Sequence, residues 1–491
     1  MTPIQFIPND PMASGGPPMR RIAPPGYPSG GSARFDVRPS APVGLYAPGT
    51  PAFAFWQTQT ALIRGLRAWR GLEGSSLSRW QGNRRVLPVH TRAGDDLNAF
   101  YDRASLQFFS HAFGGRTVHA CESADVVNHE QGHALLDAIR PDFWDAPYVE
   151  VGALHEAFGD CFALLVALTD ATTRRLAIAA SPDLGSHQFL ERLAEELADA
   201  IRREFGAQEV EPGALRRALN SFRWVDPKTL PVTAPASRLS REVHSFSRIF
   251  TGCFYDLIRN VFNAGPHTST GLRQAALAAG RLLLAAIRTA PITPRLFAAV
   301  GQRMLQADVM TGRSAHVAQI RAAFAAHGIE LAAPATSLAI PLGAGRTAAA
   351  VRRALRERLG AEPDARLAVT LVASEMHGSI AHVAAYRSLR LAGGALAGLH
   401  LRVPSAARVQ TRGAALVGLL GNPTPADSGA EQEARSFARG LVGSCQLALA
   451  GRGSRGRRHP VCATHAIEKI DGKRTIVRRG FAEHGECADP M

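Results

Sequence analysis

The chain has 491 residues, of which 46% are hydrophobic, so it is long enough for two or three domains with ample buried cores. No run of eighteen or more apolar residues predicts a membrane span, and no basic segment followed by an apolar core predicts a secretory signal at the N-terminus. Six cysteines in a chain of this length form no disulfide framework, which fits a reducing compartment. We therefore expect a cytoplasmic protein without a membrane partner, and export by a non-classical route stays open.

The net charge of +15 is carried almost entirely by arginine, since lysine occurs only at Lys228, Lys469 and Lys473. Such a bias indicates a compositional preference more than a selected binding surface. Most of the excess follows Leu331 and includes the loop 451–458, in which no aromatic residue is available for base stacking. We interpret this loop as solvated and do not expect nucleic acid as a partner, although contact with nucleic acid or an acidic partner is the alternative.

Residues 1–50 are rich in proline, glycine and serine, a composition typical of flexible segments. We expect them to form a flexible arm, too short and too polar to be a folded pro-domain. Residues 51–331 then form the domain that carries the chemistry, and residues 332–491 form a separate basic region.

The decisive motif is His129-Glu130-Gln131-Gly132-His133. Two histidines four residues apart lie one turn from each other on one face of a helix, so their imidazoles can bind one tetrahedral metal ion, usually zinc. Glu130 follows the first histidine, where its carboxylate can take a proton from an activated water. This is the equipment for attacking a peptide carbonyl.

A second segment supplies the third ligand that zinc requires. The first helix should end before Pro141, and a loop from there to about Val151 lets the chain reverse. An apolar run from Ala157 to Leu168 predicts a second helix, which Glu156 opens and on which Asp160 lies one turn further. Glu156 is therefore the expected metal ligand, and Asp160 is expected to accept the outer N–H of a ligand histidine.

With these residues in place, the chain resembles the thermolysin-like zinc metalloendopeptidases, the gluzincins that combine two helical histidines with a downstream glutamate. The resemblance covers about Phe53 to Leu331, and three further segments carry it. They are Asn98-Ala99-Phe100-Tyr101, Val243-His244-Ser245-Phe246-Ser247-Arg248-Ile249 and Arg321-Ala322-Ala323-Phe324-Ala325-Ala326-His327-Gly328-Ile329. It implies an α+β fold with a β-rich N-terminal lobe, a zinc helix and a helical C-terminal lobe, to which residues 332–491 add an α/β region.

The resemblance also implies roles for individual residues. One zinc ion would be held by His129, His133 and Glu156, with Glu130 as general base and then general acid. His244 would stabilise the oxyanion, and the backbone of Asn98 and Ala99 would pair with a peptide or protein substrate as an added strand. Arg216 is the best match to an arginine near the site, with Arg217 as a competitor, and Tyr148 is the match to an oxyanion tyrosine.

Two departures from the family pattern bear on these roles. Asp125 matches a calcium-binding aspartate, but Ala167 stands where the next calcium ligand is expected, so no family-type double calcium site is expected. Leu239 stands where an aspartate would orient His244, and Glu242 is the candidate replacement.

The region after Leu331 predicts strands at Leu338–Leu342 and Leu367–Val372 around a helix at Thr347–Leu359, a βαβ-like pattern. Residues 466–481 alternate around Asp471-Gly472, which indicates a hairpin. Four residues flank this hairpin and leave open a structural zinc site, a Cys462–Cys487 disulfide or unpaired side chains: Cys462, His465, His484 and Cys487.

The sequence thus predicts a zinc-dependent endopeptidase that prefers a hydrophobic residue just after the cleaved bond, a preference that the resemblance implies. The alternative is a binding or assembly protein built on a retired peptidase domain, with the basic C-terminal region carrying the interaction. The presence of Glu130 favours the enzyme, because a protein without catalysis has no need of the base.

Overall fold

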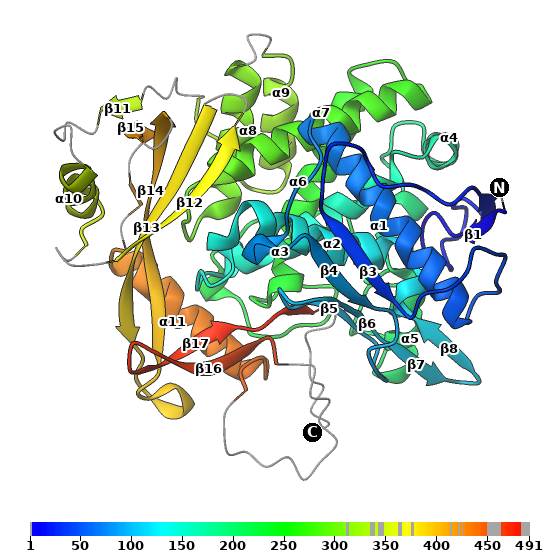
Figure 1. Cartoon of the computed structure of the whole chain (residues 1–491), viewed down its shortest axis with the longest axis horizontal. Coiled ribbons are helices and arrows are strands. Elements are labelled where there is room, and N and C mark those ends of the chain that lie inside the picture. The colour runs from blue at the N-terminus through cyan, green and yellow to red at the C-terminus, as the bar shows by residue number, and fades with distance from the viewer. Residues whose placement is uncertain are drawn as a thin grey trace.

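The computed structural model has an α+β fold, with helices at the centre of the molecule and β-sheets on two sides of them (Figure 1). Among the described helices none alone is long and apolar enough to cross a membrane, and only a pair bent by 101° passes that test by length and composition. The structure describes residues 2–310, 314–333, 339–341, 348–361, 366–374, 378–412, 415–420, 423–424, 426–448 and 463–482.

The N-terminal half is built on a five-stranded sheet in the order β18-β5-β6-β4-β3. Strand β3 is parallel to β4, β4 is parallel to β6, and β6 is antiparallel to β5. The edge strand β18 comes from the far end of the chain and pairs antiparallel with β5. The strands are β3 (Arg34–Arg38), β4 (Val86–His90), β5 (Ala99–Tyr101), β6 (Leu106–Phe108) and β18 (Phe481–Ala482).

Residues 2–50, expected to be a flexible arm, are instead packed into the fold. Phe6, Phe35 and Val37 are buried in the main core, and β3 completes the sheet. The side chain of Gln57 donates to the carbonyl of Ile7 and accepts its N–H, both at 2.9 Å. The segment has the overall composition of a flexible arm, but its few apolar residues alternate with polar ones and pack into the core, and this packing fixes its position.

Short antiparallel pairs accompany the sheet. They are β1 (Ile4–Phe6) with β2 (Arg20–Ile22), β7 (Ser110–Phe113) with β8 (Arg116–His119), and β9 (Arg192–Leu193) with β10 (Arg216–Arg217).

Helices α2 and α3 cross at the centre of the molecule, between the sheet and the other helices. Glycines allow their close approach, since a Cβ on Gly132 would lie 2.8 Å from the Cα of Gly159. Helix α2 ends at Ile139, before Pro141, as predicted. The second helix was predicted to begin at Glu156, which is wrong. It begins at Val149, two residues after Pro147, with Tyr148 as its N-cap residue.

The remaining helices surround this pair. The helices are α1 (Pro51–Glu73), α2 (Ala124–Ile139), α3 (Val149–Ala167), α4 (Ala171–Ala180), α5 (Glu195–Glu204), α6 (Val243–Asn263), α7 (Ser269–Thr289), α8 (Leu296–Met310) and α9 (Val317–Ala326), with short 3-10 turns between some of them.

The C-terminal region forms a second sheet in the order β11-β15-β14-β13-β12, to which the hairpin β16–β17 is attached through β14. The hairpin around Asp471-Gly472 is confirmed, with both turn residues at positive φ. The strands and helix of the βαβ-like prediction exist, but β11 and β12 lie at opposite edges with three antiparallel strands between them. The elements are β11 (Ala339–Pro341), α10 (Ala348–Arg358), β12 (Leu367–Ser374), β13 (Gly378–Arg390), β14 (His400–Arg412), β15 (Ala415–Leu420), α11 (Ser428–Gly443), β16 (His465–Ile470) and β17 (Lys473–Arg478).

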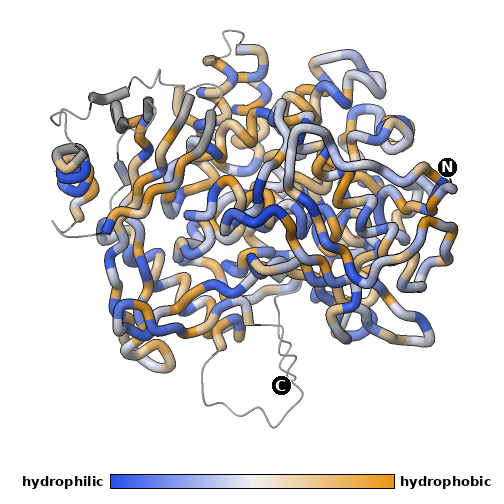
Figure 2. The backbone as a smooth tube through the Cα atoms, in the orientation of Figure 1, coloured by the Kyte–Doolittle hydropathy of each residue, from blue (hydrophilic) through white to orange (hydrophobic). Residues whose placement is uncertain are grey.

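Part of the region after Leu331 joins the main core, while a second cluster of buried residues, among them Leu355, Val383 and Val409, lies wholly within that region. Leu401, Phe437 and Phe481 belong to the same buried cluster as the residues of α2 and α3. Hydrophobic stretches occur both in the helices and in the C-terminal sheet (Figure 2). The C-terminal region therefore packs on the helical part through these shared residues and lies close enough to contribute to a site there.

Candidate metal centre

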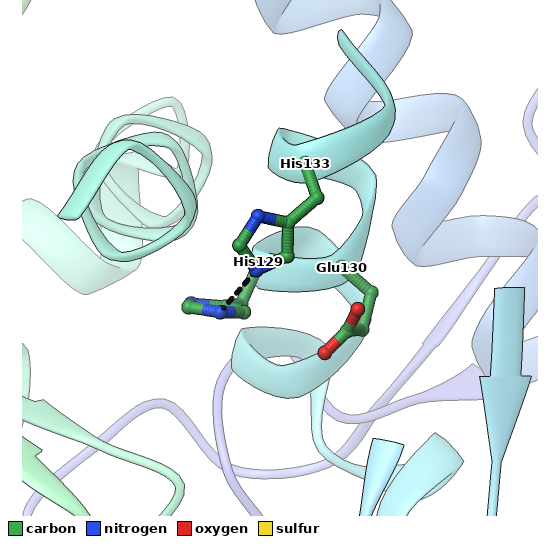
Figure 3. Close-up of side chains that lie close together, drawn as sticks. All are labelled: His129, Glu130 and His133. Atoms are coloured by element: carbon green, nitrogen blue, oxygen red, sulfur yellow. Dashed lines mark hydrogen bonds between the residues drawn. The ribbon is translucent and has the colours of Figure 1, made fainter. Parts of the chain in front are cut away.

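Two histidines of α2 face each other in the centre of the molecule (Figure 3). Ser123 caps the helix by accepting from the N–H of Val126, which fixes the first turn ahead of the motif. The Nε2 atoms of His129 and His133 lie 3.0 Å apart, and both side chains have no exposed surface. The predicted arrangement of the two histidines on one helix face is present.

Glu156 of α3 completes a three-ligand set. Its Oε2 atom lies 3.4 Å from Nε2 of His129 and 3.7 Å from Nε2 of His133. Three donors each about 2 Å from a tetrahedral zinc ion are separated by roughly 3.3 Å. The three observed separations bracket that value, so the residues fit zinc.

Electrostatics keeps Glu156 ionised and ready to bind a cation. Burial alone raises the pKa of a carboxyl, but the charges of His244 and His133 outweigh burial and hold the pKa of Glu156 well below its usual value. Glu156 is therefore an anionic oxygen donor beside two imidazole nitrogens, a donor set that suits zinc.

Asp160 holds His129 from behind, as predicted. Its Oδ1 atom lies 2.9 Å from Nδ1 of His129, so the Nδ1–H of the neutral ring donates to the carboxylate and the Nε2 lone pair faces His133. Thr251 of α6 donates to the other oxygen at 3.1 Å. Burial raises the pKa of Asp160, but Arg216 and His129 lower it to about 2.

Arg216 is the arginine near the site, and its competitor Arg217 is not. Arg216 donates from Nη2 to Asp160 at 2.8 Å and lies 3.4 Å from Nδ1 of His129. Arg217 instead donates to Glu191 at 2.6 Å. Strand β10 explains the difference, because neighbouring residues of a strand point to opposite faces.

His155 supports the second ligand. Its Nδ1 lies 3.2 Å from Nδ1 of His133, so a proton held on His133 Nδ1 is shared with His155 and leaves His133 Nε2 free to bind metal. Burial, helped by the nearby charge of His133, lowers the pKa of His155 well below its usual value. A neutral His155 can accept that hydrogen bond.

His244 stands on the open side of Glu156, with Nε2 3.3 Å from Oε2 of Glu156. Glu242 replaces the missing orienting aspartate: its Oε1 lies 2.8 Å from Nδ1 of His244, and its other oxygen accepts from the N–H groups of His244 and Ser245 as the N-cap of α6. Burial lowers the pKa of His244, but Glu156 and Glu242 raise it to about 9. While Glu156 is ionised, these two carboxylates favour the protonated form of His244.

Glu130 lies beside the histidine pair. Its carboxylate and the ligand nitrogens of His129 and His133 lie within 4.8 Å of one another, and its side chain has no exposed surface. In Figure 3 the carboxylate of Glu130 projects from α2 next to the two imidazoles. The arrangement suits proton transfer next to a bound metal ion.

The remaining predicted residues are placed differently. Ala99 lies in the edge strand β5, and Asn98 precedes it, with its carbonyl accepting from the N–H of Phe109. Tyr148 is the N-cap residue of α3, and burial together with Asp427 and Glu433 raises its pKa.

Two further predicted sites are only partly described. Burial lowers the pKa of His465, at the start of β16, well below its usual value, and its Nδ1 bonds Thr464 at 2.8 Å. Its three predicted companions, Cys462, His484 and Cys487, lie outside the described residues.

At Asp125, which the sequence matched to a calcium-binding aspartate, Nδ2 of Asn9 donates to both carboxylate oxygens. Burial, with the charge of Asp10 nearby, raises the pKa of Asp125 well above its usual value.

Sequence reasoning missed the contribution of the C-terminal region. Gln446 donates from Nε2 to Oε1 of Glu242 at 3.1 Å, and the ring of Phe481 stacks on His155 with 4.1 Å between centroids. No pattern in the sequence points to either residue, since both contacts join positions more than 200 residues apart.

A comparison of the chain with models of protein families, and one with curated proteins, finds no match. The function is therefore inferred from the arrangement of the chain's own side chains.

Proposed function

We propose that the chain is a zinc-dependent endopeptidase of the thermolysin-like type, with a two-lobed catalytic fold over about residues 51–331. The observation that carries the proposal is the trio of buried donor atoms from His129, His133 and Glu156, separated by 3.0, 3.4 and 3.7 Å, with Glu130 beside them. The tautomer that Asp160 favours leaves a nitrogen lone pair of His129 aimed at its neighbour, an arrangement that a cation stabilises.

The three donor residues would hold the metal. When bound, zinc supplies a Lewis acid that polarises the scissile carbonyl and makes water a better nucleophile at neutral pH. Asp160 and Arg216 keep the ring of His129 in its binding orientation, and His155 does so for His133.

Glu130 would take the proton from the attacking water and pass it to the leaving amine. His244, whose pKa is raised to about 9, would donate a hydrogen bond to the oxygen that becomes negative as the carbonyl carbon turns tetrahedral. Glu242 keeps this imidazole charged and directed toward the site.

The substrate would be an extended peptide that pairs with the free edge of β5 through the backbone of Ala99, next to Asn98, whose own carbonyl faces β6. Backbone pairing of this kind accepts many sequences and leaves selectivity to the side-chain pockets.

The test combines metal content with hydrolysis. We expect one equivalent of zinc per chain, and cleavage of furylacryloyl-glycyl-leucine amide that 1,10-phenanthroline abolishes. Glu130→Gln should keep the zinc and lose about 100-fold or more of the cleavage rate. The matched control Glu122→Gln, at a buried glutamate that accepts from the N–H of Gly49, should keep both.

Cleavage that the chelator leaves untouched, or equal rates for Glu130→Gln and wild type, would overturn the proposal. Bound zinc with no cleavage of any peptide, either by the full chain or by a chain that ends at Gly480, would favour the binding or assembly protein.

A further inference from the structure

The edge of β5 that a peptide substrate would use already carries a strand of the same chain. Strand β18 pairs antiparallel with β5, with Phe481 opposite Tyr101 and Ala482 opposite Phe100. The other edge of β5 pairs with β6, so β18 occupies the edge on which a substrate would add. The described chain reaches this edge directly from β17 (Figure 1).

The direction of β18 matches that of a substrate. From Phe481 to Ala482 the chain runs from Tyr101 toward Phe100, and the next residue of β5 is Ala99. A peptide that paired antiparallel with Asn98 and Ala99 would run the same way, and its amino-terminal part would need the place that β18 fills.

Buried contacts hold β18 against the metal centre. The ring of Phe481 is 1% exposed and stacks on His155 at 4.1 Å and on the ligand His133 at 4.8 Å between centroids. The guanidinium of Arg478 lies 4.0 Å from the same ring and donates to the carbonyl of Trp144, whose indole donates back to the carbonyl of Arg478. Gly480 passes β5 closely, since a Cβ there would lie 3.1 Å from the carbonyl oxygen of Tyr101.

The candidate site is closed in this arrangement. His129, Glu130, His133 and Glu156 all have no exposed surface, so a peptide carbonyl reaches them only after part of the chain moves away.

We propose that β18 is an intramolecular peptide ligand of the candidate site, which occupies the amino-side substrate position on β5 and holds the enzyme latent until it is displaced. This inference rests on the proposed function. The occupant is an extended peptide with an aromatic side chain opposite Tyr101, and substrates that extend on the amino side of the cleaved bond compete with it.

A pair of truncated chains tests the proposal. One ends at Gly480 and lacks β18, and its matched control ends at Ala482 and keeps it. We expect the chain ending at Gly480 to cleave an internally quenched ten-residue peptide with a kcat/KM roughly 10- to 100-fold higher than the control, the range that releasing one buried phenylalanine supports. Phe481→Ala in the full chain should raise kcat/KM in the same direction.

A binding measurement separates this proposal from the peptidase proposal. In the Glu130→Gln background, a fluorescein-labelled peptide with the sequence of residues 478–484 should bind the chain ending at Gly480, by fluorescence anisotropy, and bind the control at least 10-fold more weakly. If the two chains bind the peptide with different affinity but neither cleaves any peptide, the peptidase proposal fails and β18 remains the resident ligand of the site.

Equal binding and equal cleavage would overturn the role of β18. The same holds if the truncation and Phe481→Ala both lower the melting temperature without raising kcat/KM, because β18 would then be a structural strand only.

Discussion

Substitution of Gly159 by alanine should weaken metal binding through a steric push on one ligand. Gly159 lies in α3 under the ring of His129, and a Cβ there would lie 2.6 Å from Nδ1, 2.7 Å from Cε1 and 2.9 Å from Cγ of that ring. The ring has to move by roughly 1 Å to regain van der Waals separation. Zinc–nitrogen distances tolerate only about 0.2 Å, so the moved ring no longer fits the ion.

Two opposing effects set the magnitude. Alanine in a helix interior is favoured over glycine by about 1 kcal/mol, whereas overfilling a packed interior costs about 1–3 kcal/mol. Because the clash falls on a ligand held by Asp160, we expect much of its cost to appear in metal affinity, as roughly 10- to 100-fold weaker zinc binding.

The assay is a zinc titration against a chromogenic chelator, with the zinc-induced rise in melting temperature measured alongside. Gly71→Ala is the control, since Gly71 is an exposed residue of α1 with open space around its Cβ position. Gly71→Ala should stabilise the protein by about 1 kcal/mol, the helix preference of alanine over glycine, and leave zinc affinity unchanged. Wild-type zinc affinity in Gly159→Ala would refute the placement of His129 as a ligand.

Two further substitutions test charges that the structure assigns. Asp160→Asn removes the charge that pairs with His129 and Arg216, so zinc affinity or cleavage should fall about 10- to 100-fold, and an unchanged titration would contradict the supporting role of Asp160. Nε2 of His382, on β13, donates to the carbonyl of Arg288 on α7, and burial lowers the pKa of His382 to about 3. Below about pH 6.5 this imidazole is therefore protonated in the unfolded chain but stays neutral in the folded chain. The free energy of unfolding should therefore fall by about 1.4 kcal/mol per pH unit from pH 6.5 toward 3. Urea titrations at about pH 7 and pH 5.5 should show this fall in the wild type, and His382→Gln should lose it. An equal dependence of the unfolding free energy on pH in both proteins would show that His382 is not the group responsible.

The two candidate metal-binding histidines could be predicted because local rules fix their relative positions. Spacing on one helix places His129 and His133 together in any fold, and Pro141 ends that helix. Glu242 was identified as the replacement for a missing aspartate, and it both caps α6 and bonds His244. Each of these inferences involves residues close in sequence or the chemistry of one side-chain type.

The sequence could not show how distant segments meet. Residues 2–50 have the composition of a linker, yet Phe6 and Phe35 find places in the core that only the folded sheet creates. The strands β11 and β12 were located, but their pairing depends on β13, β14 and β15, which lie between them in space. Burial and partner choice across long separations are properties of the whole fold, and periodicity within a segment does not encode them.

The C-terminal region and the metal centre depend on each other. Gln446 donates a hydrogen bond to Glu242, whose carboxylate in turn lies against Nδ1 of His244. On the other side, Phe481 stacks on His155, which lies against Nδ1 of His133. A separate binding module would have no reason to place a donor on Glu242 and an aromatic ring against His133 and His155.

These two contacts also differ in consequence. The bond from Gln446 helps to orient a group that catalysis needs, so its loss should lower activity. The strand of Phe481 fills a position that a substrate needs, so its loss should raise activity. If the C-terminal region both completes and restrains the proposed active site, removing the first contact should lower the cleavage rate and removing the second should raise it. A region that only packs beside the site would not give these opposite effects.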